Sequence, residues 1–168
     1  MKILKNTLIV LLSIFAISSA DAQEKPKSPA ETVTGKIKDA TITINYGSPS
    51  VRGRKIWGEL VPFDAVWRAG ANDATTFETD KDLIIEGSKL PAGKYSFFII
   101  PNEKETTIIF NKEAKQWGAY KYDEKKDQLR VKVAPKKASS SVEKLVYVIN
   151  SNDVVLSWDN WNIGFTVK

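Results

Sequence analysis

The sequence predicts one all-β domain, an antiparallel β-sandwich of the jelly-roll kind, with a β-barrel as the alternative. Three observations support this prediction. Short segments rich in β-branched and aromatic residues recur along the chain, turn residues separate them at short intervals, and no window carries the apolar stripe of a helix of several turns. About nine or ten short strands in one domain are typical of a sandwich or jelly roll.

The first residues are typical of an export signal. Lys2 and Lys5 precede a short apolar run over Thr7–Ile17, and Ala20 and Ala22 supply the small residues that signal peptidase recognises. The apolar run is too short for a permanent transmembrane helix. We therefore expect cleavage after Ala22, or alternatively after Ala20, and a periplasmic or secreted domain without a transmembrane segment.

The composition limits both the partners and the chemistry. The chain has no cysteine, which excludes disulfides and a lipid anchor on cysteine, so the fold must depend on its hydrophobic core. It has no histidine, which excludes Ser-His-Asp catalysis, imidazole metal sites and the usual proton shuttle near neutral pH. The net charge of +5 comes from lysines interleaved with acidic residues, so we expect no nucleic-acid partner.

The chain divides into three parts. We expect a signal peptide over residues 1–22, a tether with two prolines over residues 23–31, and the β-sandwich domain over residues 32–168. Within the domain, Ala40–Tyr46 alternates apolar and polar residues, as a half-buried strand does. Tyr95–Ile100 is apolar on both faces and bounded by turn residues, which favours a strand that is covered on both sides.

The remaining strands follow the same two patterns. They are expected over Thr106–Phe110, Leu129–Val133, Leu145–Ile149, Val154–Trp158 and Trp161–Val167. A Ser-Asn-Asp turn at residues 151–153 predicts that the strands on either side form a hairpin. Residues 111–128 are the best candidate for a helix, but Gly118 interrupts them and they carry no steady apolar stripe.

One long segment, Gly47–Ala74, interrupts this succession of strands. It is too long for an ordinary connection, and segments of this kind in compact domains are usually functional or disordered. Trp57, Phe63 and Trp67 need burial, which argues against disorder. We therefore expect the segment to pack against the rest of the domain.

The same region carries sequence motifs of a known family. The matching runs are Ile44–Pro49, Gly53–Gly58, Leu60–Phe63, Val66–Glu78, Leu90–Pro101, Ile109–Asn111 and Gln116–Tyr120. On these runs the chain resembles the bacterial secreted domain-of-unknown-function family 2911, and the resemblance covers nearly all of the mature chain. It implies export and a single β-rich domain, and it assigns no catalytic residues.

Candidate ligand-binding residues gather in and just after the long segment. They are Arg52, Arg54, Trp57, Trp67, Arg68, Asn72, Thr76 and Glu78. The planar fork of arginine suits carboxylates and phosphates, and tryptophan faces suit the apolar faces of sugars, a platform that Trp117 and Tyr120 could extend. The pattern predicts binding of a glycan or another anionic component of the cell envelope. Alternatively, the arginines pair with carboxylates to fix the segment, and the tryptophans fill the core.

Two other function classes stay open. Read as a strand, residues 75–80 would place Glu78, Asp80 and Asp82 on one face, with Asp73 nearby, and paired carboxyls are what a carbohydrate hydrolase or lyase needs. The same pattern is typical of a solvated strand face, so Glu78 is the one catalytic candidate and we favour a non-catalytic domain. A structural module that binds an envelope protein is the other alternative.

No cofactor and no metal site are expected from the sequence. The acidic turns at Asp123–Asp127 and Asn150–Asp153 offer oxygen ligands but do not match a calcium-binding loop.

Overall fold

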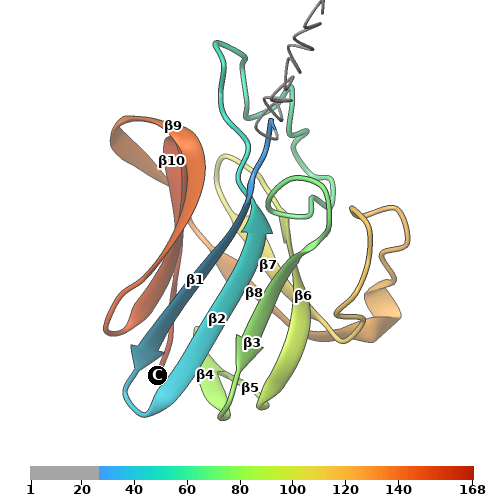
Figure 1. The fold of residues 1–168 in the computed structure, drawn as a ribbon, viewed down its shortest axis with the longest axis vertical. Coiled ribbons are helices and arrows are strands. Elements are labelled where there is room, and N and C mark those ends of the chain that lie inside the picture. The colour runs from blue at the N-terminus through green and yellow to red at the C-terminus, as the bar shows by residue number, and fades with distance from the viewer. Residues whose placement is uncertain (1–26) are drawn as a thin grey trace, which may run out of the picture.

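The computed structural model describes residues 27–168, and they form an antiparallel β-sandwich (Figure 1). The expected signal peptide and most of the expected tether lie outside the described residues. The larger layer is a six-stranded sheet in the order β1 (Ala30–Ile37), β2 (Ala40–Gly47), β3 (Thr75–Thr79), β6 (Gly93–Ile100), β7 (Thr106–Asn111) and β8 (Asp127–Val133). This sheet stays open, with β1 and β8 at its edges, so the sandwich prediction is confirmed over the closed alternative. Strand β1 begins at Ala30, inside the segment expected to be a tether.

The second layer is a long hairpin of β9 (Lys136–Ile149) and β10 (Asp153–Thr166), joined by the turn that the sequence predicted. A small hairpin of β4 (Leu83–Ile85) and β5 (Ser88–Leu90) lies at one end of the sandwich, and β4 adjoins the C-terminus through the Ile84 and Lys168 backbones. Figure 1 shows the orange and red hairpin standing beside the sheet, with the first strands in front of it.

Strand β10 is one strand where the sequence predicted two. Its buried positions are Val154, Leu156, Trp158, Trp161, Ile163 and Phe165, so the alternation changes phase between the two tryptophans. The pairing with β9 shifts register at Asp159, whose φ is 51°. A bulge of this kind moves every following side chain to the other face. Because of the bulge, Trp158 and Trp161 both face the core.

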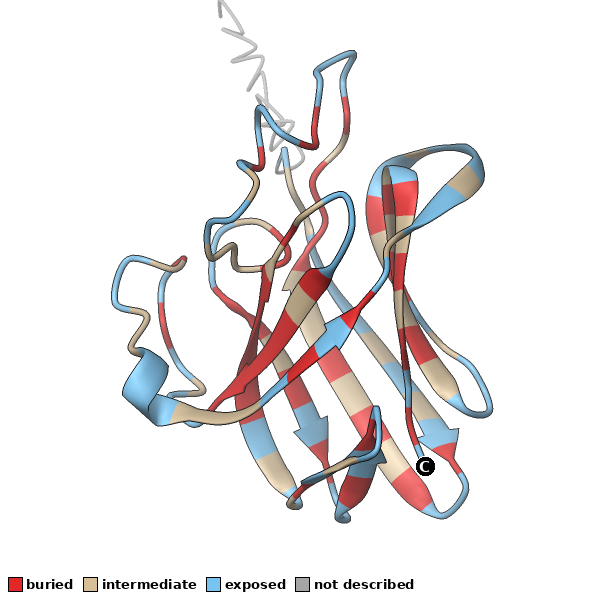
Figure 2. Cartoon of the chain, turned by 180° about the vertical axis from the view of Figure 1, so that it is seen from behind, coloured by how far each residue is buried: buried red, intermediate tan, exposed pale blue. Residues whose placement is uncertain are grey.

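The core lies between the two layers and is strongly aromatic. Phe77, Phe97 and Phe110 of the sheet contact Phe165 of β10, with ring centroids 5.8–6.3 Å apart. Along β2 the residues alternate as predicted, since Ala40, Ile42 and Ile44 are buried on the inner face. Figure 2 shows the same banding of buried and exposed residues along the strands.

The segment after β7 covers part of the outer face of the sheet. Here the described chain forms only a short 3-10 helix, η1 (Glu124–Lys126), in place of a longer helix. Phe98 and Ile109 point away from the main core, and they form a second apolar cluster with Ala74 beneath Ala119 and Tyr122. This second cluster explains why the sequence of β6 is apolar on both faces.

The long segment after β2 bridges the two layers, which confirms that it packs against the domain. At its start, Leu145 of β9 donates its backbone N–H to the Pro49 carbonyl (2.9 Å). Near its end, Trp67 and Ile99 of β6 exchange two backbone hydrogen bonds of 2.8 and 2.9 Å. The segment therefore extends the hydrogen bonding of both sheets.

Within residues 27–168, no helix has the length and apolar character needed to cross a membrane.

Candidate functional site

Trp57 and Trp67 lie in an aromatic cluster inside the domain. Trp57 is 6% exposed, its ring stacks on Trp161 at 4.7 Å and 13°, and its Nε1–H donates to the Trp158 carbonyl at 3.4 Å. Trp67 is partly buried and stacks on Trp158 at 5.7 Å. Because other protein rings occupy these aromatic faces, neither tryptophan presents a free platform to a sugar. This arrangement matches the core interpretation of both tryptophans.

Arg52 and Arg54 fix the long segment through main-chain carbonyls. Arg52 Nη2 donates to the Lys27 carbonyl at 2.8 Å. Arg54 donates from Nε to the Val51 carbonyl at 3.0 Å and from Nη2 to the Ser50 carbonyl at 2.6 Å. Both side chains therefore stabilise local backbone, whereas the sequence had suggested either a ligand or carboxylate partners.

Arg68 lies elsewhere, on the outer face of the sheet. Its neighbour Trp67 faces the core, and Val66, which shares its face, packs into the second apolar cluster. Arg68 Nη1 lies 3.7 Å from the position that a Cβ on Gly118 would occupy. The three arginines that cluster in the sequence thus contact three different parts of the structure.

A groove of about 650 Å³ opens on the outer face of the sheet, at the end where β1, β2 and β3 meet. Its floor is formed by Thr32, Asn45 and Thr76, which alternate with the inward-facing core residues of those strands. One wall is the segment 71–74 and the other is the segment 114–116. Asn72 and Thr76 are the two predicted site residues that line this groove.

The groove floor belongs to a polar row that crosses all six strands. Register places the following residues side by side, one on each strand: Thr32, Asn45, Thr76, Ser96, Asn111 and Asp127. In the open half, Thr32 Oγ1 donates to Asn45 Oδ1 at 2.7 Å, and Asn45 Nδ2 donates to Thr76 Oγ1 at 3.3 Å. The row could not be recognised in the sequence, because each strand contributes only one of its residues.

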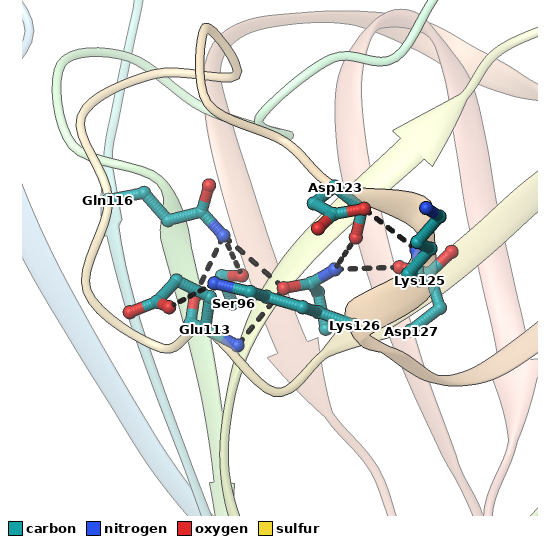
Figure 3. A network of polar contacts seen from close by, with 8 residues as sticks. Ser96, Glu113, Gln116, Asp123, Lys125, Lys126 and Asp127 are labelled. Carbon is teal, nitrogen blue, oxygen red and sulfur yellow. Dashed lines mark hydrogen bonds and ion pairs between the residues drawn. The ribbon is translucent and has the colours of Figure 1, made fainter.

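The other half of the row is buried and holds the segment 112–126 against the sheet (Figure 3). Gln116 Nε2 donates to Ser96 Oγ at 3.1 Å and to Asn111 Oδ1 at 3.4 Å. Asn111 Nδ2 donates to the Asp123 carbonyl at 2.9 Å and to Asp127 Oδ1 at 2.8 Å. The row therefore serves two purposes, since one half floors the groove and the other half anchors one of its walls.

The segment 112–126, which supplies the anchored wall, carries two exposed aromatic side chains just beyond that wall, Trp117 (62% exposed) and Tyr120 (83% exposed). The two walls are tied together by hydrogen bonds from Ala74 N to the Gln116 carbonyl (3.0 Å) and from Gly118 N to the Asn72 carbonyl (3.2 Å). The backbones of Trp117 and Asp73, which belongs to the other wall, pair in an isolated antiparallel β-bridge. Of the four aromatic residues considered from the sequence, these two are the ones with accessible rings, and they follow the groove-lining residues 114–116 in the chain without lining the groove themselves.

The candidate carboxylates do not form a catalytic pair. Glu78 lies outside the groove lining and pairs with Lys94 at 3.2 Å. Strand β3 ends at Thr79, so Asp80 and Asp82 follow the strand and do not share a face with Glu78. The Thr41 backbone N–H lowers the pKa of Asp80, and the Lys89 ammonium lowers the pKa of Asp82. A glycosidase general acid needs a raised pKa, which is the opposite of what these two carboxyls show.

Residues 27–168 contain no group of three acidic side chains placed to hold a metal ion.

Tyr122 links the anchored wall to the polar row and makes stability depend on pH. Its hydroxyl donates to Asp127 Oδ2 at 2.6 Å, and burial followed by this bond raises its pKa well above the usual value of 10.0. Above about pH 10 the unfolded tyrosine loses its proton while the folded one keeps it. The free energy of unfolding should therefore fall as the pH rises beyond about 10.

We expect this fall to be shallower in Tyr122→Phe, which has no hydroxyl to ionise at this position. Urea unfolding of both proteins from about pH 8 to about pH 11 measures it. Lysine and the other tyrosines titrate equally in the two proteins, so the difference isolates Tyr122. Equal slopes would show that Tyr122 ionises alike in the folded and unfolded states.

Fold and groove together define a class of protein: a single-domain antiparallel β-sandwich with a polar groove on the outer face of its larger sheet. The chain belongs to the family described as Protein of unknown function (DUF2911), which matches residues 28–167 and confirms the resemblance in the sequence. Neither the curated proteins nor the solved structures gave a match to the chain.

Proposed function

We propose that this protein is an exported, non-catalytic domain that binds a glycan in the outer-face groove. The observation that carries the proposal is the combination of a floor of neutral hydroxyl and amide groups with an exposed indole, Trp117, that directly follows the groove-lining Gln116. Sugars present hydroxyl groups that both donate and accept, together with apolar C–H faces. Thr32, Asn45 and Thr76 supply the matching donors and acceptors, and Trp117 supplies a matching flat surface.

Gln116 supports the same proposal from the groove wall. The residue is 9% exposed, and its Oε1 has no hydrogen-bond partner among residues 27–168. A buried acceptor without a partner costs about 1–3 kcal/mol. Because this atom is itself buried, a small shift of the groove wall is needed before a ligand hydroxyl can reach it and relieve the cost.

Charges around the groove are of both signs and leave room for neutral recognition. Glu31 and Asp73 line it together with Lys94 and Lys115. Because these charges balance, the electrostatic potential above the groove floor should favour neither cations nor anions strongly. Hydrogen bonding and stacking therefore decide binding there. Export, which the N-terminal sequence predicts, would bring the groove to the envelope, where glycans are abundant.

Replacing Trp117 by alanine should weaken glycan binding about tenfold or more, because the ring supplies the stacking surface. A glycan array would identify ligands, and titration calorimetry on the best of them would measure the loss. Leu60→Ala is the matched control, since Leu60 is also an exposed apolar side chain (45% exposed), whereas it does not adjoin a groove-lining residue in the chain as Trp117 does. Binding that persists unchanged in Trp117→Ala would contradict the proposed platform, and an array without hits would favour a protein partner for this surface.

A further inference from the structure

We propose that Arg68 binds a carboxylate group of the ligand, so that the glycan in this groove is an acidic one. The inference rests on the proposed glycan-binding function and adds the chemical class of the ligand.

Arg68 differs from the other three arginines of the chain. Arg52 and Arg54 donate to main-chain carbonyls, and Arg130 pairs with Glu124 at 2.6 Å and with Asp127 at 3.3 Å. The Arg68 side chain makes no hydrogen bond or ion pair with residues 27–168, and its Nε is buried without a partner. A partly buried guanidinium group without an anion is costly, and an incoming carboxylate would offset that cost.

Gly118 lies against both the Tyr120 ring and the Arg68 guanidinium. This glycine has a φ of 62°, and a Cβ there would lie 2.9 Å from the Tyr120 ring and 3.7 Å from Arg68 Nη1. The distance of 2.9 Å is too short for a Cβ contact, so the Tyr120 ring already occupies this position. Because Tyr120 is 83% exposed, its ring can turn aside and let a small planar group approach the guanidinium.

Gly118 itself adjoins the groove. Gly118 donates its N–H to the carbonyl of Asn72, which lines the groove, and Gln116 lines it from two positions earlier in the chain. A sugar seated on the groove floor could therefore extend a substituent past Gly118 to Arg68. Because Nε is buried, the two Nη groups are the donors that remain for a substituent, and two parallel N–H groups match the two oxygens of a carboxylate.

Matched acidic and neutral ligands test the inference. Oligomers of galacturonate, mannuronate and glucuronate, and the methyl ester of each, are titrated calorimetrically into the wild type, Arg68→Gln and Arg54→Gln. We expect the wild type to bind at least one acid about tenfold or more tightly than its ester, and added salt to reduce this preference. Arg68→Gln should bring the acid down to the affinity of the ester and leave the ester unchanged. Arg54→Gln should change neither.

The possible results separate the two levels of the proposal. Equal binding of acid and ester by the wild type, or equal weakening of both by Arg68→Gln, would overturn the role of Arg68 and leave glycan binding standing. Failure of every oligomer and ester to bind would overturn both. If Arg68→Gln does not fold, Arg68→Lys keeps the charge without the planar fork and should reduce the preference for the acid. The salt dependence of the wild type tests the charge without any variant.

Discussion

Trp57→Ala should lower the free energy of unfolding by about 3–5 kcal/mol, the range for removing a large aromatic side chain from a core. Trp57 lies at the centre of the aromatic cluster, where it stacks on Trp161 and contacts Trp67 and Trp158 edge to face. Its removal leaves a cavity between the long segment and β10 that the surrounding rings cannot fill without moving. Urea unfolding followed by circular dichroism would measure the loss.

Trp117→Ala is the control for this prediction. Trp117 is mostly exposed, so its removal should change stability by no more than about 0.5 kcal/mol. The two variants should therefore affect different properties: Trp57→Ala should lower stability, and Trp117→Ala should weaken ligand binding. A stable Trp57→Ala protein that no longer binds glycan would instead assign the platform to Trp57.

Asn111→Ala should destabilise the domain by about 3–5 kcal/mol, because several buried polar groups lose partners together. The Asn111 amide donates to Asp123 and Asp127, and its Oδ1 accepts from Glu113 N at 3.0 Å and from Gln116 Nε2 at 3.4 Å. These bonds hold the segment that carries Trp117 and Tyr120. Amide hydrogen exchange within residues 112–126 should therefore become faster, and ligand affinity should fall as the wall loosens.

Asn45→Ala is the matched control, since Asn45 is an asparagine of the same polar row. Among residues 27–168 its side chain bonds only the Thr32 and Thr76 hydroxyls in the open half, where water can replace it. We expect a loss of about 1 kcal/mol or less and unchanged exchange in residues 112–126. Equal effects of the two asparagine variants would show that the buried half of the row does not anchor the wall.

Much of the fold could be predicted because it depends on local pattern. The alternation of Ala40–Tyr46 identified β2, and the apolar run Tyr95–Ile100 identified a strand covered on both faces. The division of β10 into two strands was wrong because the change of phase at Asp159 resembles a strand end. A bulge and a turn both interrupt alternation, and only pairing with β9 distinguishes them.

The site was less predictable, because its residues meet only through register. The polar row takes one residue from each of six strands, from Thr32 to Asp127, so no single strand contains more than one of them. The clustering of three arginines suggested convergence, but Arg52, Arg54 and Arg68 contact different parts of the structure. Of the predicted ligand residues, Asn72 and Thr76 line the groove.

The sequence alone determined the all-β class, the absence of histidine and cysteine chemistry, and the membership of the family. It did not determine which tryptophans are buried. Trp57-Gly58 and Trp117-Gly118 are the same dipeptide, and both glycines have a positive φ. Trp57 is buried because Trp158 and Trp161 of a distant strand cover it, whereas Trp117 stays exposed beside the groove. Burial depends on which remote segments pack together, and the tertiary structure decides that.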